Sequence, residues 1–150
     1  MKVMGHRGAA GLALENTLNS FEMAKLLGVD FIELDIHKTA DGELVVVHDN
    51  DLRRISNQSI SIKNSSLKDI QKICLIDAQS VVPTLKQVIN ATEGVPLVIE
   101  IKSDGCVDEL TKLLKKHKDR DIAIASFRHN ELKLLRSKVP EYSDSKELNQ

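Results

Sequence analysis

The sequence has no tryptophan, only four other aromatic residues and only two cysteines among its 150 residues. Cys74 and Cys106 form no C-x-x-C pair, so the sequence excludes a disulfide scaffold and suits a reducing compartment. No apolar run approaches the length of a membrane-spanning helix, and no signal peptide precedes the first segment that looks folded. We therefore expect a cytoplasmic protein without a membrane span.

The sequence also lacks an excess of either charge, because its net charge is −1 at neutral pH. This balance provides no basic surface for nucleic acid or an anionic membrane, and we expect neither as a partner. The chain is long enough for one domain with a sizeable core. It has no internal repeat, so we expect one folded unit at 1–140 followed by a polar tail at 141–150.

The stretch at 30–36 is the most informative part of the chain. It is rich in β-branched and aromatic residues and is bounded by turn residues, which predicts a strand. Side chains alternate between the two faces of a strand, so Glu33 and Asp35 share one face. Two adjacent carboxylates repel each other, and burying them unpaired is unfavourable. Either this face is exposed to solvent, or a divalent cation with oxygen ligands lies between the carboxylates.

The rest of the chain alternates between strand and helix patterns. Helical spacing of apolar residues predicts helices after Asn16–Thr17, from Leu85, over about 107–117 and around Leu132. Between them we expect strands at 2–5, 30–36, 44–48, 97–102 and 121–125. The order indicates a parallel α/β sheet with right-handed crossovers. The less regular segment at 50–80 predicts a loop with one or two short helical turns, too short for a large lid.

Charged residues occur at the carboxyl ends of four of these strands. They are His6 with Arg7, Glu33 with Asp35, His48, and Glu100 with Lys102. In α/β barrels this edge of the sheet holds the active site, so we expect these side chains to lie together.

A site of this composition favours a particular chemistry. Glu33, Asp35 and Glu100 would form an all-oxygen site, which suits Mg²⁺, Ca²⁺ or Mn²⁺ better than zinc. Arg7 and Lys102 could balance the remaining negative charge and bind an anionic substrate such as a phosphate. Histidines titrate near neutral pH and suit the acid and base of a displacement at phosphorus.

Taken together, the motifs resemble the glycerophosphodiester phosphodiesterase family. They occur in family order from residue 1 to about 140: G-H-R-G at 5–8, E-N-T at 15–17, F-I-E-L-D-I at 31–36 with T-x-D-G at 39–42, V-V-x-H-D at 45–49, L-x-R at 52–54, V-P-T-L at 82–85, I-E-I-K at 99–102 and A-S-F at 125–127. The resemblance implies a TIM (β/α)₈ barrel. It also implies metal-dependent hydrolysis of glycerophosphodiesters to glycerol 3-phosphate and an alcohol.

The resemblance also implies roles for single residues. The metal would be held by Glu33, Asp35 and Glu100. His6 and His48 would be the catalytic acid and base, and which is which stays open.

The resemblance also implies roles for three further residues. Arg7 and Lys102 would bind the substrate phosphate, and Glu15 would orient Arg7 or the metal ligands. The remaining histidines, at 37, 117 and 129, match no motif, so we expect their replacement to be nearly silent.

The chain departs from the family in its length. A complete barrel takes about 250 residues, and only about the first five strand units are recognisable here, without the tryptophan-containing segment of the family's final strand. We expect a second copy or a missing C-terminal segment to complete the sheet, because Val46 and Val98 would otherwise be poorly covered.

Two other functions remain open. The chain could be an inactive fragment or interaction module of the same fold. It could also be a related phosphodiesterase of the lysophospholipase D or sphingomyelinase D type.

Overall fold

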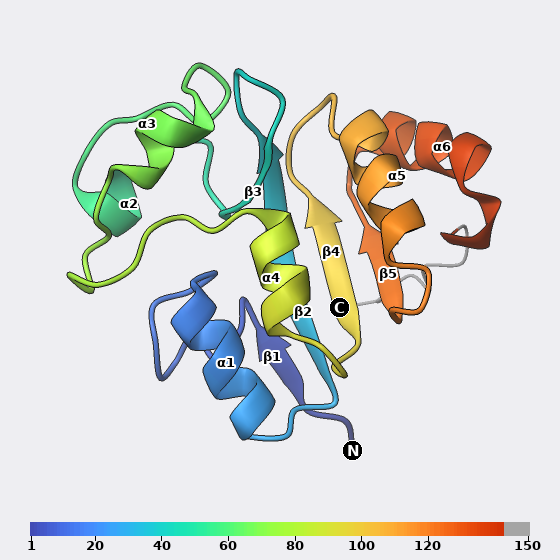
Figure 1. The fold of residues 1–150 in the computed structure, drawn as a ribbon, viewed down its shortest axis with the longest axis horizontal. Coiled ribbons are helices and arrows are strands. Elements are labelled where there is room, and N and C mark those ends of the chain that lie inside the picture. The colour runs from blue at the N-terminus through green and yellow to red at the C-terminus, as the bar shows by residue number, and fades with distance from the viewer. Residues whose placement is uncertain (143–150) are drawn as a thin grey trace.

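The computed structural model of the chain describes residues 1–142 (Figure 1). Its strands are β1 (Met4–His6), β2 (Phe31–Lys38), β3 (Leu44–Val46), β4 (Leu97–Ile101) and β5 (Ile122–Ala125). Its helices are α1 (Leu18–Leu26), α2 (Arg53–Ser56), α3 (Leu67–Gln71), α4 (Leu85–Ala91), α5 (Val107–Lys116), α6 (His129–Lys138) and the 3₁₀ turn η1 (Pro140–Tyr142). The polar tail expected at 141–150 lies, from residue 143 onward, outside the described residues.

Four strands form a parallel sheet in the order β1-β2-β4-β5. In Figure 1, α1, α4 and α5 lie in front of this sheet. Their apolar side chains pack against one face of the strands, where Phe21, Leu34, Leu85 and Ile99 are fully buried. The expected α/β class is therefore confirmed.

One strand has a different direction from the one we expected. β3 pairs with β2 in antiparallel register, with Ile36 opposite Val46 and Lys38 opposite Leu44. The interpretation of 44–48 as a further parallel strand was therefore wrong. The reason is the short connection at 39–43, in which Gly42 takes a φ of +85°. A tight turn joins antiparallel neighbours, whereas a parallel return needs a crossover of about a dozen residues.

β1 and β3 share one edge of β2, because β4 occupies the other edge. β1 pairs with residues 31–33 of β2, and β3 pairs with residues 36–38. The end of β1 and the end of β3 therefore meet near the middle of β2. This arrangement brings the segments after His6 and after Val46 to the same place, beside Asp35.

β3 lies between two hydrophobic cores. Leu44 and Val46 pack in the main core under the helices, whereas Val45 and Val47 pack in a second core with the segment at 50–82. Val46 is 1% exposed, so the expectation that it would be poorly covered was wrong. Val98, on the face of the sheet away from that core, is half-buried, in line with the expectation.

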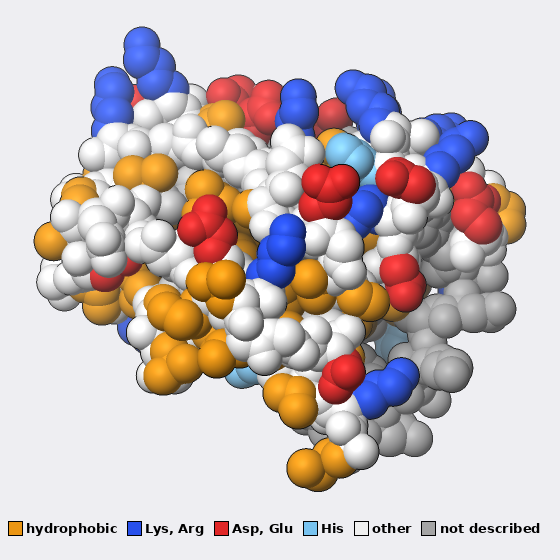
Figure 2. Space-filling model, turned by 60° about the horizontal axis from the view of Figure 1, so that its bottom comes forward, with side chains coloured by type: hydrophobic (Ala, Val, Ile, Leu, Met, Phe, Trp, Pro, Cys, Tyr) orange, Lys and Arg blue, Asp and Glu red, His pale blue; other side chains and the backbone are white. Residues whose placement is uncertain are grey.

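A surface groove of about 830 Å³ lies between α1, the loop after β1 and residues 76–79. Exposed Leu12, Leu26 and Ile76 line it. Figure 2 shows hydrophobic side chains gathered on one face of the molecule, in the lower left of the view. No helix within residues 1–142 is long and apolar enough to cross a membrane.

Candidate active site

The loop after β1 is held in an unusual backbone conformation. Arg7 has a φ of +51° and Gly8 a φ of +84°. A Cβ atom on Gly8 would lie 2.1 Å from Oγ of Ser20, and that hydroxyl donates a hydrogen bond to the Arg7 carbonyl at 2.8 Å. Only glycine fits here, which explains the G-H-R-G sequence. The loop is thereby pressed against α1, and the Arg7 side chain is directed toward β2.

Asn16 and Thr17 have different roles at the start of α1. Thr17 is the N-cap of α1, since its hydroxyl accepts a hydrogen bond from the Ser20 N–H. Asn16 is buried with a φ of +54°, and its Nδ2 donates to Asp35 Oδ2 at 3.1 Å. Strained backbone at a non-glycine residue is typical of functional sites. Asn16 was not predicted as a site residue, although the E-N-T motif contains it.

Three carboxylates converge at the centre of the sheet edge. Oxygen atoms of Glu33, Asp35 and Glu100 lie within 4.8 Å of one another. Strand register accounts for this, because Asp35 lies opposite Glu100 and Glu33 precedes Asp35 by two residues on the same face. Burial, followed by the charge of Asp35, raises the pKa of Glu33 to about 8. Burial is the larger cause, and repulsion between Glu33 and Asp35 adds to it.

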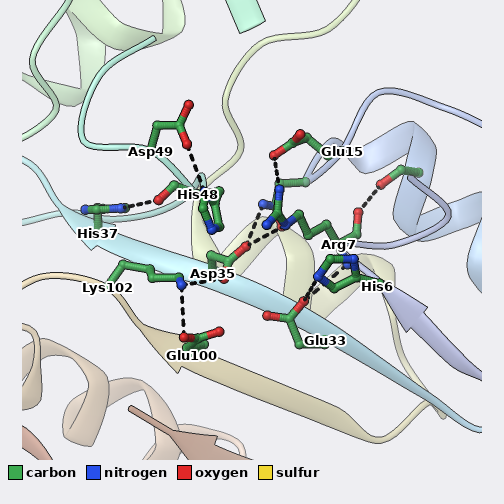
Figure 3. A network of polar contacts seen from close by, with 12 residues as sticks. His6, Arg7, Glu15, Glu33, Asp35, His37, His48, Asp49, Glu100 and Lys102 are labelled. Carbon is green, nitrogen blue, oxygen red and sulfur yellow. Dashed lines mark hydrogen bonds and ion pairs between the residues drawn. The ribbon is translucent and has the colours of Figure 1, made fainter. Parts of the chain in front are cut away.

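Two cations border this cluster (Figure 3). Lys102 Nζ lies 2.9 Å from Glu100 Oε1 and 3.9 Å from Asp35 Oδ1. Arg7 Nε lies 3.5 Å from Asp35 Oδ2, and its Nη1 donates to Glu15 Oε2 at 3.0 Å. Glu100 Oε1 is buried, and Lys102 lies close enough to form an ion pair with it.

The two predicted catalytic histidines differ in their surroundings. His6 is 57% exposed, and its Nε2 lies 3.7 Å from Glu33 Oε2. His48 Nδ1 lies 2.8 Å from Asp49 Oδ1, and a hydrogen bond from Arg54 is the largest factor that lowers the pKa of Asp49. Because the ionised Asp49 can only accept, His48 Nδ1 donates and Nε2 carries the lone pair in the neutral ring.

The structure thus brings all eight predicted site residues to one edge of the sheet, and it adds residues that the sequence analysis missed. Arg54 contacts both Glu15 and Asp49. The buried His37 donates from Nε2 to the His48 carbonyl at 2.9 Å. Strand alternation placed His37 on the face of Glu33 and Asp35, and the L-x-R motif included Arg54, so both signals were present.

Comparisons with known proteins identify the family to which the sequence is similar. A model of the glycerophosphoryl diester phosphodiesterase family matches residues 6–108. A glycerophosphodiester phosphodiesterase of Caldanaerobacter subterraneus is 33% identical over an alignment of 152 positions including gaps, which covers 92% of this chain and 63% of that protein. Human lysophospholipase D GDPD1 is 29% identical over 137 residues, which cover 82% of this chain and 44% of that protein.

A solved structure shows the same arrangement of elements. An Oleispira antarctica phosphodiesterase in complex with the product sn-glycerol-3-phosphate matches with a TM-score of 0.88 at 28% identity. The match covers 94% of this chain and 63% of that one. The chain therefore spans less than two thirds of the length of the proteins it matches. The expected fold class, part of a TIM barrel, is confirmed.

Proposed function

Because the chain belongs to the glycerophosphoryl diester phosphodiesterase family, we propose that it carries the site for metal-dependent hydrolysis of glycerophosphodiesters to glycerol 3-phosphate and an alcohol. One observation carries this proposal. Three carboxylates meet within 4.8 Å, and Arg7 and Lys102 lie beside them at the carboxyl ends of β1 and β4. This combination can hold a divalent cation and a phosphate diester next to each other.

The residues present fit a divalent cation. The donors are all carboxylate oxygens, which Mg²⁺, Ca²⁺ and Mn²⁺ prefer. Burial, followed by the charge of Asp35, raises the pKa of Glu33 to about 8, and a bound cation would favour the ionised carboxylate again. When bound to Glu33, Asp35 and Glu100, the cation supplies positive charge to the phosphate oxygens and to the attacking oxygen.

The chain's own residues provide the remaining functions. Arg7 presents a planar guanidinium and Lys102 a point charge, which together bind and orient the phosphate. His48 offers the Nε2 lone pair, because Nδ1 is engaged by Asp49. His48 and His6 then act as the acid–base pair, one taking a proton from the attacking water and the other giving a proton to the departing alcohol.

Lysophospholipids are a second class of substrate. The similarity to human lysophospholipase D GDPD1 favours this candidate. The same phosphorus–oxygen bond would be broken, and the product would keep an acyl chain.

The test is a hydrolysis assay with the purified protein and each of the three cations. Glycerophosphocholine should yield glycerol 3-phosphate and choline, whereas lysophosphatidylcholine would yield lysophosphatidic acid. We expect His6→Ala and His48→Ala each to reduce turnover by about a hundredfold or more, and replacement of the exposed His129 by alanine to change little. Equal losses for His129→Ala and His48→Ala would overturn the assignment, and hydrolysis that is unaffected by chelator would exclude the metal-dependent reaction.

A further inference from the structure

One motif has no role in the function proposed so far. The L-x-R segment at 52–54 ends in Arg54, which lies on the short helix α2 in the segment between β3 and α4. Its Nη1 donates to Glu15 Oε1 at 2.5 Å and its Nη2 to Glu15 Oε2 at 2.9 Å. Its Nε donates to Asp49 Oδ2 at 2.9 Å. One guanidinium thus binds two carboxylates that come from separate parts of the chain.

We propose that Arg54 is a positioning residue that fixes His48 and Arg7 together, acting through Asp49 and Glu15. The proposal rests on the function proposed above, in which His48 transfers a proton and Arg7 binds phosphate. Among the described residues, the polar partners of Arg54 are Glu15 and Asp49 and none of the three carboxylates of the acidic cluster.

The first branch of this arrangement determines which nitrogen of His48 is protonated. Asp49 uses Oδ1 for the His48 ring at 2.8 Å and Oδ2 for Arg54 Nε at 2.9 Å. The carboxylate therefore cannot turn away from the ring without losing Arg54. A fixed acceptor at Nδ1 keeps the proton there and leaves Nε2 free for proton transfer.

The second branch determines where the Arg7 side chain lies. Glu15 Oε2 accepts from Arg7 Nη1 at 3.0 Å and from Arg54 Nη2 at 2.9 Å. The Glu15 side chain is 13% exposed and that of Arg54 is 50% exposed, so Glu15 is the shielded partner of this pair. Because Glu15 is held by Arg54, Arg7 has a fixed partner on one side and Asp35, 3.5 Å away, on the other.

Arginine is the residue that this geometry requires. Its guanidinium presents several N–H donors in a fixed plane and can bind two carboxylates at once. A lysine at the same position has one mobile ammonium group, which cannot reproduce the fork. The neighbouring Arg53 provides the matched control, because it lies on the same helix but donates to Ser59.

The experiment compares Arg54→Met, Arg54→Lys and Arg53→Met in the full chain. Long-range ¹H–¹⁵N NMR spectra report which ring nitrogen of His48 carries the proton, whether or not the protein turns over substrate. We expect His48 to be Nδ1-protonated in the unmodified protein and in Arg53→Met, and a mixture of tautomers in both Arg54 variants. With glycerophosphocholine, Arg54→Met should lower kcat by about 10- to 100-fold, the scale for groups that orient a functional side chain, and should raise KM through Arg7.

The outcomes separate the two proposals. An unchanged His48 tautomer in folded Arg54→Met, or an equal change in Arg53→Met, overturns the role of Arg54. If Arg54→Met does not fold, Arg54→Lys decides, because it keeps the positive charge but not the fork. Absence of hydrolysis in the unmodified protein would contradict the proposed function, while the tautomer comparison would still decide on Arg54.

Discussion

Two groups of carboxylates lie side by side at the edge of the sheet, and they behave in opposite ways. We call Glu33, Asp35 and Glu100 the inner cluster, and Glu15 and Asp49 the rim pair. In the inner cluster, burial raises the pKa of Glu33 to about 8. In the rim pair, hydrogen bonds from Arg54 are the main cause that lowers the pKa of both carboxyl groups.

The difference comes from the partners of these side chains. Both rim carboxylates bind Arg54, and Glu15 also binds Arg7. The inner carboxylates also have cationic neighbours, since Lys102 Nζ lies 2.9 Å from Glu100 Oε1, but their oxygens crowd one another within 4.8 Å. Ion pairs such as those of the rim pair stabilise a scaffold, whereas crowded, buried carboxylates such as those of the inner cluster suit the cation of the proposed site. In the proposed site, the rim pair therefore belongs to the framework that holds the side chains in place, and the inner cluster is where the cation would bind.

The largest expected effect comes from neutralising Glu33 in the inner cluster, and neutralising Glu15 in the rim pair is the comparison. Glu33→Gln removes a metal ligand in the proposed site, so turnover should fall by more than about a hundredfold, beyond the loss typical of orienting groups. Excess Mg²⁺ should raise the free energy of unfolding of the unmodified protein by about 2.7 kcal/mol at one hundred times its dissociation constant. This stabilisation should vanish in Glu33→Gln and persist in Glu15→Gln, as measured by thermal unfolding with and without chelator.

The rim variant is the control for this prediction. If Glu15→Gln loses the response to Mg²⁺ as completely as Glu33→Gln, the two groups are not distinct. If neither variant changes the response, the cation binds elsewhere.

The two groups should also give opposite dependences of stability on pH. In chelator, the pKa of Glu33 is about 8 in the folded protein and near 4.5 in the unfolded chain. The folded protein therefore holds the proton more tightly, and its free energy of unfolding should fall as the pH rises from about 4.5 to about 8. The rim carboxyls have lowered pKa values, so their contribution is present above their usual pKa values and is lost as the pH falls through the lowered ones.

Denaturant unfolding over a pH series in chelator measures both effects. The difference between the unmodified protein and Glu33→Gln isolates Glu33 from His37, whose own pKa is lowered by burial. A difference that is constant with pH would contradict the inner-cluster assignment. Arg54→Met should reduce the loss of stability on the acid side and leave the fall between pH 4.5 and 8 in place.

Much of this site could be predicted from local sequence patterns. Alternation along 31–36 placed Glu33 and Asp35 on one face, and the rule that strand ends share an edge brought in Glu100 and Lys102. These inferences succeed because periodicity and parallel register are properties of single segments and their order.

Other features depend on contacts that leave no periodic signature. Arg54 and Glu15 are 39 positions apart, and nothing in either segment indicates their pairing. The direction of β3 was wrong because its continuous apolar run is typical of a strand buried on both faces. The run is indeed buried on both faces, but a second core, instead of a helix layer, covers one of them. The hydrogen bond from Asn16 to Asp35 likewise joins residues 19 positions apart, and nothing in either segment indicates it.

The smallest expected effect concerns His37, whose side chain contacts the backbone of His48. His37 matches no motif and was expected to be as replaceable as His117 and His129, but it is 3% exposed and donates to the carbonyl of His48 at 2.9 Å. His37→Ala leaves that carbonyl without its donor, so the free energy of unfolding should fall by about 1 kcal/mol, the usual net contribution of one hydrogen bond. His37→Gln keeps an N–H donor at a similar reach and should restore the lost stability, together with the position of His48.

Alanine at the exposed His129 should change neither stability nor turnover. Denaturant unfolding and the kcat for glycerophosphocholine measure these differences, and equal behaviour of the alanine variants at 37 and 129 would return His37 to the replaceable group.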